Sequence, residues 1–152
     1  MTPAPSLSRT VDPATGRRPW RIGLLVVGWF NLLSALAGGV GLIVTNGVGM
    51  GMPLSWLAGS PFDSYLGPGI ILLLVVGGSQ ALAVLLQHRH QPWYPAAAAV
   101  AGIGMVIWIY VEVVLLPVYS LLHTVYFATG LLQLIFTLLC LGLLPADRSR
   151  SD

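Results

Sequence analysis

Four long runs of apolar residues constrain this chain more than any other feature of its sequence. They cover about 22–44, 65–87, 95–116 and 121–144, close to the ~20 residues that a helix needs to cross a bilayer. Apolar side chains surround each run and do not form a single stripe, as expected when lipid is the solvent. We therefore predict an all-α fold: a four-helix transmembrane bundle in contact with the lipid bilayer.

The scarcity of charge supports this prediction. The chain is 56% hydrophobic and 8% charged, whereas soluble domains carry roughly 25% charged residues. Most charges fall in residues 9–21 and 147–152. No helix has a basic face, so the sequence offers no surface for nucleic acid. We expect a disordered tail over 1–19, a transmembrane domain over 20–145 and a second tail over 146–152.

The start of the first run raises an alternative, a cleaved signal peptide. Three arginines precede the run, and Ala35-Leu36-Ala37 resembles a signal-peptidase site. However, the apolar stretch continues through Val44, beyond the 7–15 residues typical of a signal peptide. The length of the run favours an uncleaved helix.

The arginines predict the orientation of the bundle. All seven basic residues are arginines, and they precede the first helix, lie between the second and third helices, or follow the fourth. Loops 45–69 and 117–120 contain none. The positive-inside rule then places both termini in the cytoplasm and the protein in the cell (plasma) membrane. The long loop 45–69 is therefore extracytoplasmic, and its aromatic residues predict a short interfacial helix or cap.

Three amide side chains fall near the middle of the predicted spans. Counting about 1.5 Å per residue places Asn31, Gln80 and Gln133 at similar depths. They are candidates for binding a ligand in a polar pocket. The alternative is that they form hydrogen bonds between helices, a common use of polar side chains in membrane bundles.

A second polar group lies near the long-loop side. Glu112 is close to the end of the third helix and His123 to the start of the fourth, so a short turn brings them to equal depth. A carboxyl and an imidazole in contact could act as acid and base, or form a structural pair. Both are candidate catalytic residues, and Asp63 and Tyr126 are candidate ligand-binding residues.

Several kinds of chemistry find no support. Cys140 is the single cysteine, and the three histidines lack the spacing of a zinc site. Met50 and Met52 could bind Cu(I), but no further soft ligand accompanies them. We therefore predict no metal and no cofactor. Phosphate-binding loops, nucleophile elbows and paired-carboxylate motifs are absent.

Two segments carry a family resemblance. Pro61–Gly69, with the sequence PFDSYLGPG, and Ile107–Val113, with the sequence IWIYVEV, resemble uncharacterised small four-helix membrane proteins of actinobacteria. The resemblance runs from Ile22 to Leu144 and implies no known activity. The chain is also loosely similar to DoxX-like proteins in size and helix count. Small multidrug exporters carry an essential glutamate in their first helix, which this chain lacks.

Two classes of function remain from the sequence, and enzymatic activity stays undecided. The first is a non-catalytic accessory or interaction component, acting as a homo-oligomer or with a membrane-protein partner. The second is a site for a small molecule, lipid or proton centred on Glu112 and His123. A cavity that reaches Glu112 would favour the second class, and a packed interior would favour the first.

Overall fold

The structure is a computed structural model that describes residues 13–143, and within this range it contains helices and no strands. Four helical segments are long and apolar enough to cross a membrane: Arg18–Thr45, Leu66–His88, Tyr94–Leu115 and Leu121–Leu141. The predicted four-helix transmembrane fold is therefore confirmed. The protein is an integral membrane protein whose helices contact lipid.

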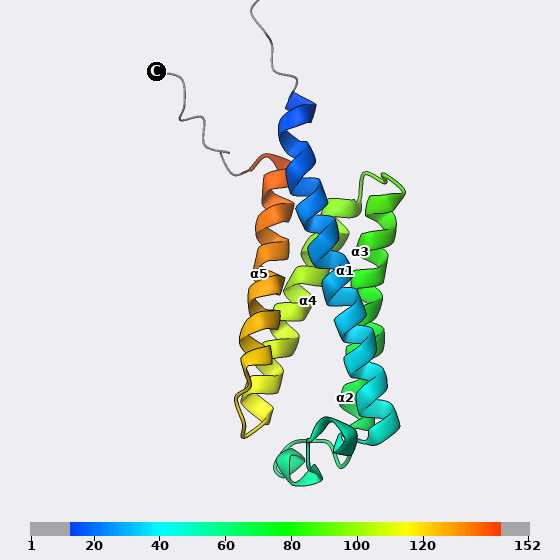
Figure 1. Cartoon of the computed structure of the whole chain (residues 1–152), viewed down its shortest axis with the longest axis vertical. Coiled ribbons are helices and arrows are strands. Elements are labelled where there is room, and N and C mark those ends of the chain that lie inside the picture. The colour runs from blue at the N-terminus through cyan, green and yellow to red at the C-terminus, as the bar shows by residue number, and fades with distance from the viewer. Residues whose placement is uncertain (1–12, 144–152) are drawn as a thin grey trace, which may run out of the picture.

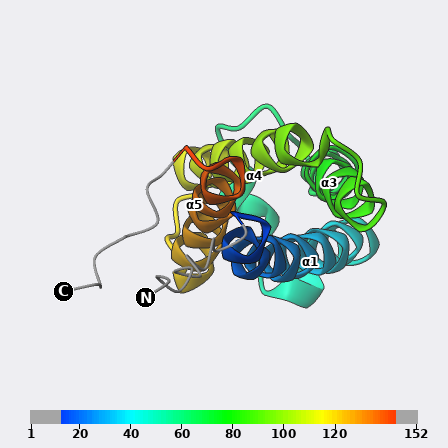
Figure 2. The same ribbon diagram turned by 90° about the horizontal axis from the view of Figure 1, so that it is seen from above.

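The first span is α1 (Pro13–Thr45), and the third and fourth are α4 (Tyr94–Leu115) and α5 (Leu121–Leu141). The second span is continuous but changes its helical type along its length. It consists of α2 (Leu66–Ile71), a π-helical segment η3 (Leu72–Gly77) and α3 (Gly78–His88). Figures 1 and 2 show the four spans side by side in a closed ring, so that each span packs against two neighbours.

Two helix boundaries differ from the prediction. α1 begins at Pro13, so residues 13–19, which we expected in the tail, are helical. α5 ends at Leu141 and not at 144, because Gly142 adopts a left-handed conformation with φ of 72° and closes the helix. Residues 1–12 and the predicted tail 146–152 lie outside the described residues.

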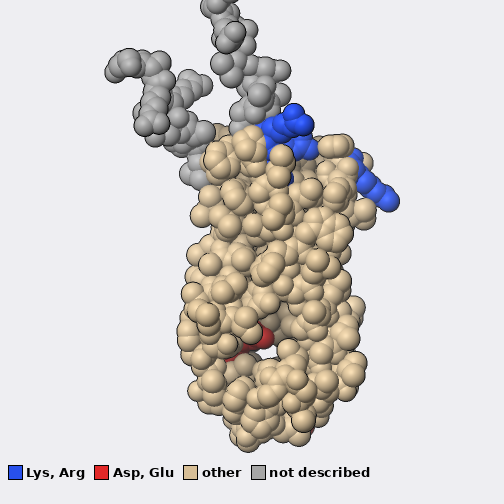
Figure 3. All heavy atoms as spheres, viewed as in Figure 1, with Lys and Arg blue, Asp and Glu red and all other residues tan. Residues whose placement is uncertain are grey.

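The two ends of the bundle have different chemistry. We call the end that holds Arg18, Arg21 and Arg89 the basic end, and Figure 3 shows blue arginine side chains at this end of the bundle. We call the opposite end the loop end. It holds residues 46–65 and the turn between α4 and α5 (Figure 1). Every arginine in the described part of the chain therefore lies away from the loop end.

Glycines allow α1 and the second span to approach closely near the loop end. A Cβ atom built on Gly39 would lie 2.8 Å from the Leu73 Cβ atom and 3.0 Å from the Gly69 carbonyl oxygen. A Cβ atom on Gly69 would lie 3.1 Å from the Gly39 carbonyl oxygen. The two backbones are thus in direct contact, as small residues permit between membrane helices.

The long loop folds back against the bundle around Tyr65. Its two short 3₁₀ helices are η1 (Val48–Met50) and η2 (Leu54–Leu57). The Tyr65 side chain is 1% exposed, and its hydroxyl donates to the Pro53 carbonyl oxygen at 3.1 Å. The Tyr65 backbone N–H donates to Asn46 Oδ1 at 2.8 Å. These contacts hold the loop over the end of the bundle, where it forms one wall of a pocket.

Candidate functional site

A pocket of about 840 Å³ lies inside the loop end. In Figure 3 it is a hollow in the face formed by α1 and α5, with an acidic side chain visible inside. Of the two acidic residues in the described range, Glu112 lines this pocket and Asp63 does not. Its walls come from α1, the long loop, α4 and α5. The cavity therefore reaches the carboxyl group that the sequence singled out.

Glu112 lies in the last turn of α4, about 27 Å along the helix from Tyr94 at the basic end. Its side chain is half-buried, and its backbone carbonyl accepts from the Leu116 N–H at 2.8 Å. The Trp108 side chain, one turn earlier on the same helix, is a hydrogen-bond partner of the carboxyl group. Spacing of four residues places the indole and the carboxyl on the same helix face.

His123 is held in place by the start of α5. The Ser120 backbone N–H donates to His123 Nδ1 at 3.0 Å, and the Leu122 N–H donates to Ser120 Oγ at 3.3 Å. The Ser120 side chain and the backbone of His123 complete a capping box, with histidine in the position that glutamate or glutamine usually takes. The Tyr119 ring stacks on the imidazole at a centroid distance of 5.6 Å. The imidazole is therefore positioned by the helix start.

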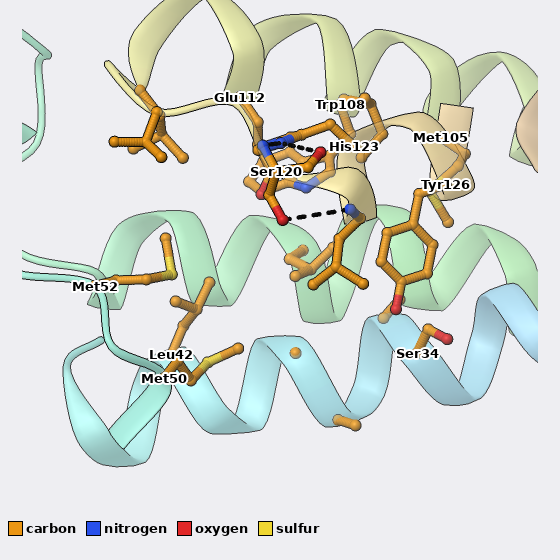
Figure 4. A pocket seen from close by; sticks show the side chains of 18 of the residues that line it. Ser34, Leu42, Met50, Met52, Met105, Trp108, Glu112, Ser120, His123 and Tyr126 are labelled. Atoms are coloured by element: carbon orange, nitrogen blue, oxygen red, sulfur yellow. Dashed lines mark hydrogen bonds between the residues drawn. The ribbon is translucent and has the colours of Figure 1, made fainter. Parts of the chain in front are cut away.

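Glu112 and His123 share the pocket without a hydrogen bond or ion pair between them. Both line it, and Figure 4 shows them on the wall formed by α4 and α5, with Met50 and Met52 on the opposite wall. Among residues 13–143 the structure contains no hydrogen bond or ion pair between the carboxyl and the imidazole. Their predicted equal depth suggested a direct pair, but His123 uses its Nδ1 atom to cap α5.

Tyr126 also lines the pocket, as the sequence suggested for a ligand-binding residue. Its ring stacks on Phe30 of α1 at a centroid distance of 6.0 Å. In Figure 4 its hydroxyl points across the pocket toward Ser34 of α1. The pocket thus has one polar region near Glu112 and a second, smaller one near Tyr126, with apolar surface between them.

A second pocket of about 400 Å³ lies between the second span and α4. Its lining is apolar apart from two side chains, those of Tyr65 and Glu112. Glu112 and Trp108 line both pockets, so they stand where the two hollows meet. The two pockets are therefore separated by a wall to which both of these residues contribute.

The three midplane amides form a cluster apart from these pockets. Gln133 Oε1 accepts from Asn31 Nδ2 at 2.8 Å and from Gln80 Nε2 at 3.1 Å. Gln133 Nε2 donates to Gln80 Oε1 at 3.0 Å and to the Ala98 carbonyl oxygen at 3.2 Å. All three side chains are at most 1% exposed. This arrangement supports the interpretation that they form hydrogen bonds between helices.

Asp63 is the candidate that lies apart from all of the others. It is exposed in the long loop, outside both pocket linings. Sequence reasoning missed Trp108 and Ser120 as partners of Glu112 and His123. Both leave a signal, since Trp108 precedes Glu112 by one helical turn and Ser120 precedes His123 by the three residues of a capping box.

The site offers carboxyl, imidazole and hydroxyl groups but no cluster of metal ligands. Among residues 13–143, no three histidine, cysteine, aspartate or glutamate side chains lie close enough together to hold a metal ion. The fold and the pocket define a four-helix integral membrane protein with a hollow beside a membrane carboxyl group. In comparisons with known proteins, no family model, no curated protein and no solved structure matches the chain. The resemblance to actinobacterial membrane proteins stays a prediction.

Proposed function

We propose that this protein binds a small amphipathic molecule in the loop-end pocket. The observation that carries the proposal is the cavity of about 840 Å³ that reaches Glu112. The sequence left two classes of function open. A cavity that reaches Glu112 favours a ligand site over a packed, non-catalytic bundle. Its volume lies within the range of roughly 300–1,000 Å³ that is typical of small-molecule pockets.

The lining fits a molecule with one polar end and a larger apolar part. Leucine, methionine and aromatic side chains form most of the wall, and polar groups gather near Glu112, Ser120 and His123. Ligand sites commonly combine an apolar wall with a few placed polar groups in this way. The hollow opens on the side of the bundle (Figure 3), so the occupant would enter from the surrounding lipid.

The orientation proposed from the arginines determines on which side of the membrane this pocket lies. With both termini in the cytoplasm, the loop end faces the extracytoplasmic side of the plasma membrane. The occupant would then come from the outer half of the bilayer. A carrier, a sensor or an accessory subunit that presents such a molecule to a partner would all use the site in this way.

Native mass spectrometry of the protein in lipid nanodiscs tests the proposal. We expect wild type to retain a bound amphiphile, and Ala37→Phe, which places a ring in the pocket wall, to lose it. Ala128→Phe is the matched control, because Ala128 is exposed on α5 outside both pockets. Equal adducts in all three proteins, or none in wild type, would contradict the proposal.

A further inference from the structure

Within residues 13–143, the carboxyl group of Glu112 has no arginine within reach, and the chain contains no lysine. Between residues 22 and 147 the chain contains one arginine, Arg89, and no lysine. Arg89 follows α3 at the basic end, whereas Glu112 lies in the last turn of α4 at the loop end. A carboxyl group in a lipid-facing cavity is costly without a partner, and such residues commonly mark a binding site.

His123 already uses its Nδ1 atom at the start of α5. A backbone N–H can only donate, so the bond from the Ser120 N–H to His123 Nδ1 requires a lone pair on that nitrogen. A protonated imidazole carries N–H groups on both nitrogens and would lose this bond. The helix start therefore occupies His123 Nδ1, which also lies 3.3 Å from the Ser120 carbonyl oxygen.

The wall around Glu112 is rich in groups that favour a positive charge. The aromatic rings of Trp56, Trp108, Tyr119 and Tyr126 line the same pocket. The electron-rich faces of such rings attract organic cations, and the attraction grows when water is excluded. Three methionine side chains add polarizable sulfur to the wall.

We propose that the pocket selects a lipophilic monocation: an amine or quaternary ammonium group attached to an apolar tail. The inference rests on the proposed function, and it names the class of ligand. The positive group lies beside Glu112, where the attraction between opposite charges is stronger than in water. The tail lies along the apolar wall of the larger pocket or of the adjoining one that shares Glu112. An anionic amphiphile is repelled by the same carboxylate.

The test uses two probes of similar shape that differ in net charge. Decyltrimethylammonium is a cation, and decyldimethylamine N-oxide is neutral overall. Binding is measured by isothermal titration calorimetry in zwitterionic nanodiscs, and titrations of empty nanodiscs are subtracted to remove partition into lipid. The variants are Glu112→Gln, which removes the charge, and Glu112→Asp, which keeps it. Thermal unfolding of each variant establishes that it is folded, and Glu112→Asp serves if Glu112→Gln does not fold.

We expect wild type to bind the cation at least tenfold more tightly than the N-oxide. Glu112→Gln should lose this preference, and Glu112→Asp should keep part of it. His123→Gln should keep it as well, because among the described residues no hydrogen bond or ion pair joins the imidazole to the Glu112 carboxyl group. Complete loss of the preference in Glu112→Asp would count against a charge-based site.

Failure of this inference is distinguishable from failure of the proposed function. Equal binding of the two probes, reduced for both by Ala37→Phe, would overturn the charge preference and leave an amphiphile pocket. No binding of the cation to wild type would also overturn the inference. The proposed function would then stand or fall with the adducts seen by native mass spectrometry.

Discussion

The side-chain amides of Gln80 and Gln133 bond each other in both directions at the centre of the bundle. Gln80 Nε2 donates to Gln133 Oε1 at 3.1 Å, and Gln133 Nε2 donates to Gln80 Oε1 at 3.0 Å. Gln133 Oε1 also accepts from Asn31, and Gln133 Nε2 also donates to the Ala98 carbonyl oxygen. The Gln133 amide therefore uses both lone pairs of its oxygen and both of its N–H groups. The second span and α5 are thus joined by a fully bonded polar group in a setting that offers no water.

Gln133→Leu should destabilise the protein more than Asn31→Leu. Removing the Gln133 amide leaves buried groups of Gln80 and Asn31 without partners, at a cost of about 1–3 kcal/mol. Asn31 Nδ2 bonds to Gln133, whereas Asn31 Oδ1 has no partner among the described residues. Chemical unfolding in a mild detergent measures both variants. The reverse order of destabilisation would show that Asn31 is the more important member.

The Gln80–Gln133 pair should also show strong coupling. Replacing both residues by leucine removes the two partners together, so the double variant should lose less stability than the sum of the single variants. We expect an interaction energy of about 1 kcal/mol in a double-mutant cycle. A control cycle pairs Gln133→Leu with Gln91→Leu, since Gln91 is exposed at the basic end. Additivity within the Gln80–Gln133 cycle would show that the two amides do not depend on each other.

Gly39→Ala should destabilise the bundle because α1 and the second span touch there. The added methyl group would lie 2.8 Å from the Leu73 Cβ atom, so one helix must move, at a cost of about 1–3 kcal/mol. Gly78→Ala is the matched control, since a Cβ atom at Gly78 meets nothing within 4 Å. That variant should be neutral or slightly more stable. Equal effects of the two substitutions would show that the contact at Gly39 is unimportant.

Glu112 and His123 should behave almost independently in the empty protein. From their depth alone we expected a direct pair, but His123 Nδ1 accepts from the Ser120 N–H. A double-mutant cycle of Glu112→Gln and His123→Gln, measured by thermal unfolding, should therefore give an interaction energy below about 0.5 kcal/mol. Stronger coupling between the two substitutions would indicate that the side chains pair directly in the membrane.

Cysteine labelling tests the orientation that the arginines predict. In a Cys140→Ala background, a membrane-impermeant thiol reagent added to intact cells should label Ser55→Cys and Ser64→Cys in the long loop. It should label Gln91→Cys, at the basic end, only after the membrane is opened. The positive-inside rule predicts this pattern. Labelling of Gln91→Cys in intact cells would reverse the orientation and with it the side on which the pocket lies.

Much of the fold follows from the sequence because hydrophobic length is a strong constraint in a membrane. The second, third and fourth helices begin within one residue of the predicted positions. On the last helix, spacings of three and four put Gly130, Gln133 and Thr137 on one face, and all three are buried. Counting residues along the helices places Asn31, Gln80 and Gln133 at similar depths, and their side chains form hydrogen bonds with one another.

The candidate site could be predicted only in part. Counting residues along the helices predicts that Glu112 and His123 lie near each other. It does not predict that the Ser120 backbone N–H donates to the Nδ1 atom of His123. Pocket volume depends on how far neighbouring helices separate, and periodicity within one helix carries no such information. The start of α1 at Pro13 also differs from the predicted tail over 1–19, since proline is tolerated in the first helical turn.

The loop-end pocket should expose the Glu112 carboxyl group to molecules in the bilayer, and the proposed function depends on this exposure. Dicyclohexylcarbodiimide, an apolar reagent that adds to carboxylic acids, tests it directly when the protein is in lipid nanodiscs. Intact-mass measurement with peptide mapping should find one adduct per chain, on Glu112, reduced in Ala37→Phe and by excess decyltrimethylammonium, and unchanged in Ala128→Phe. An unlabelled wild type, or labelling of exposed Asp63 in preference to Glu112, would contradict the exposure of Glu112 to the bilayer.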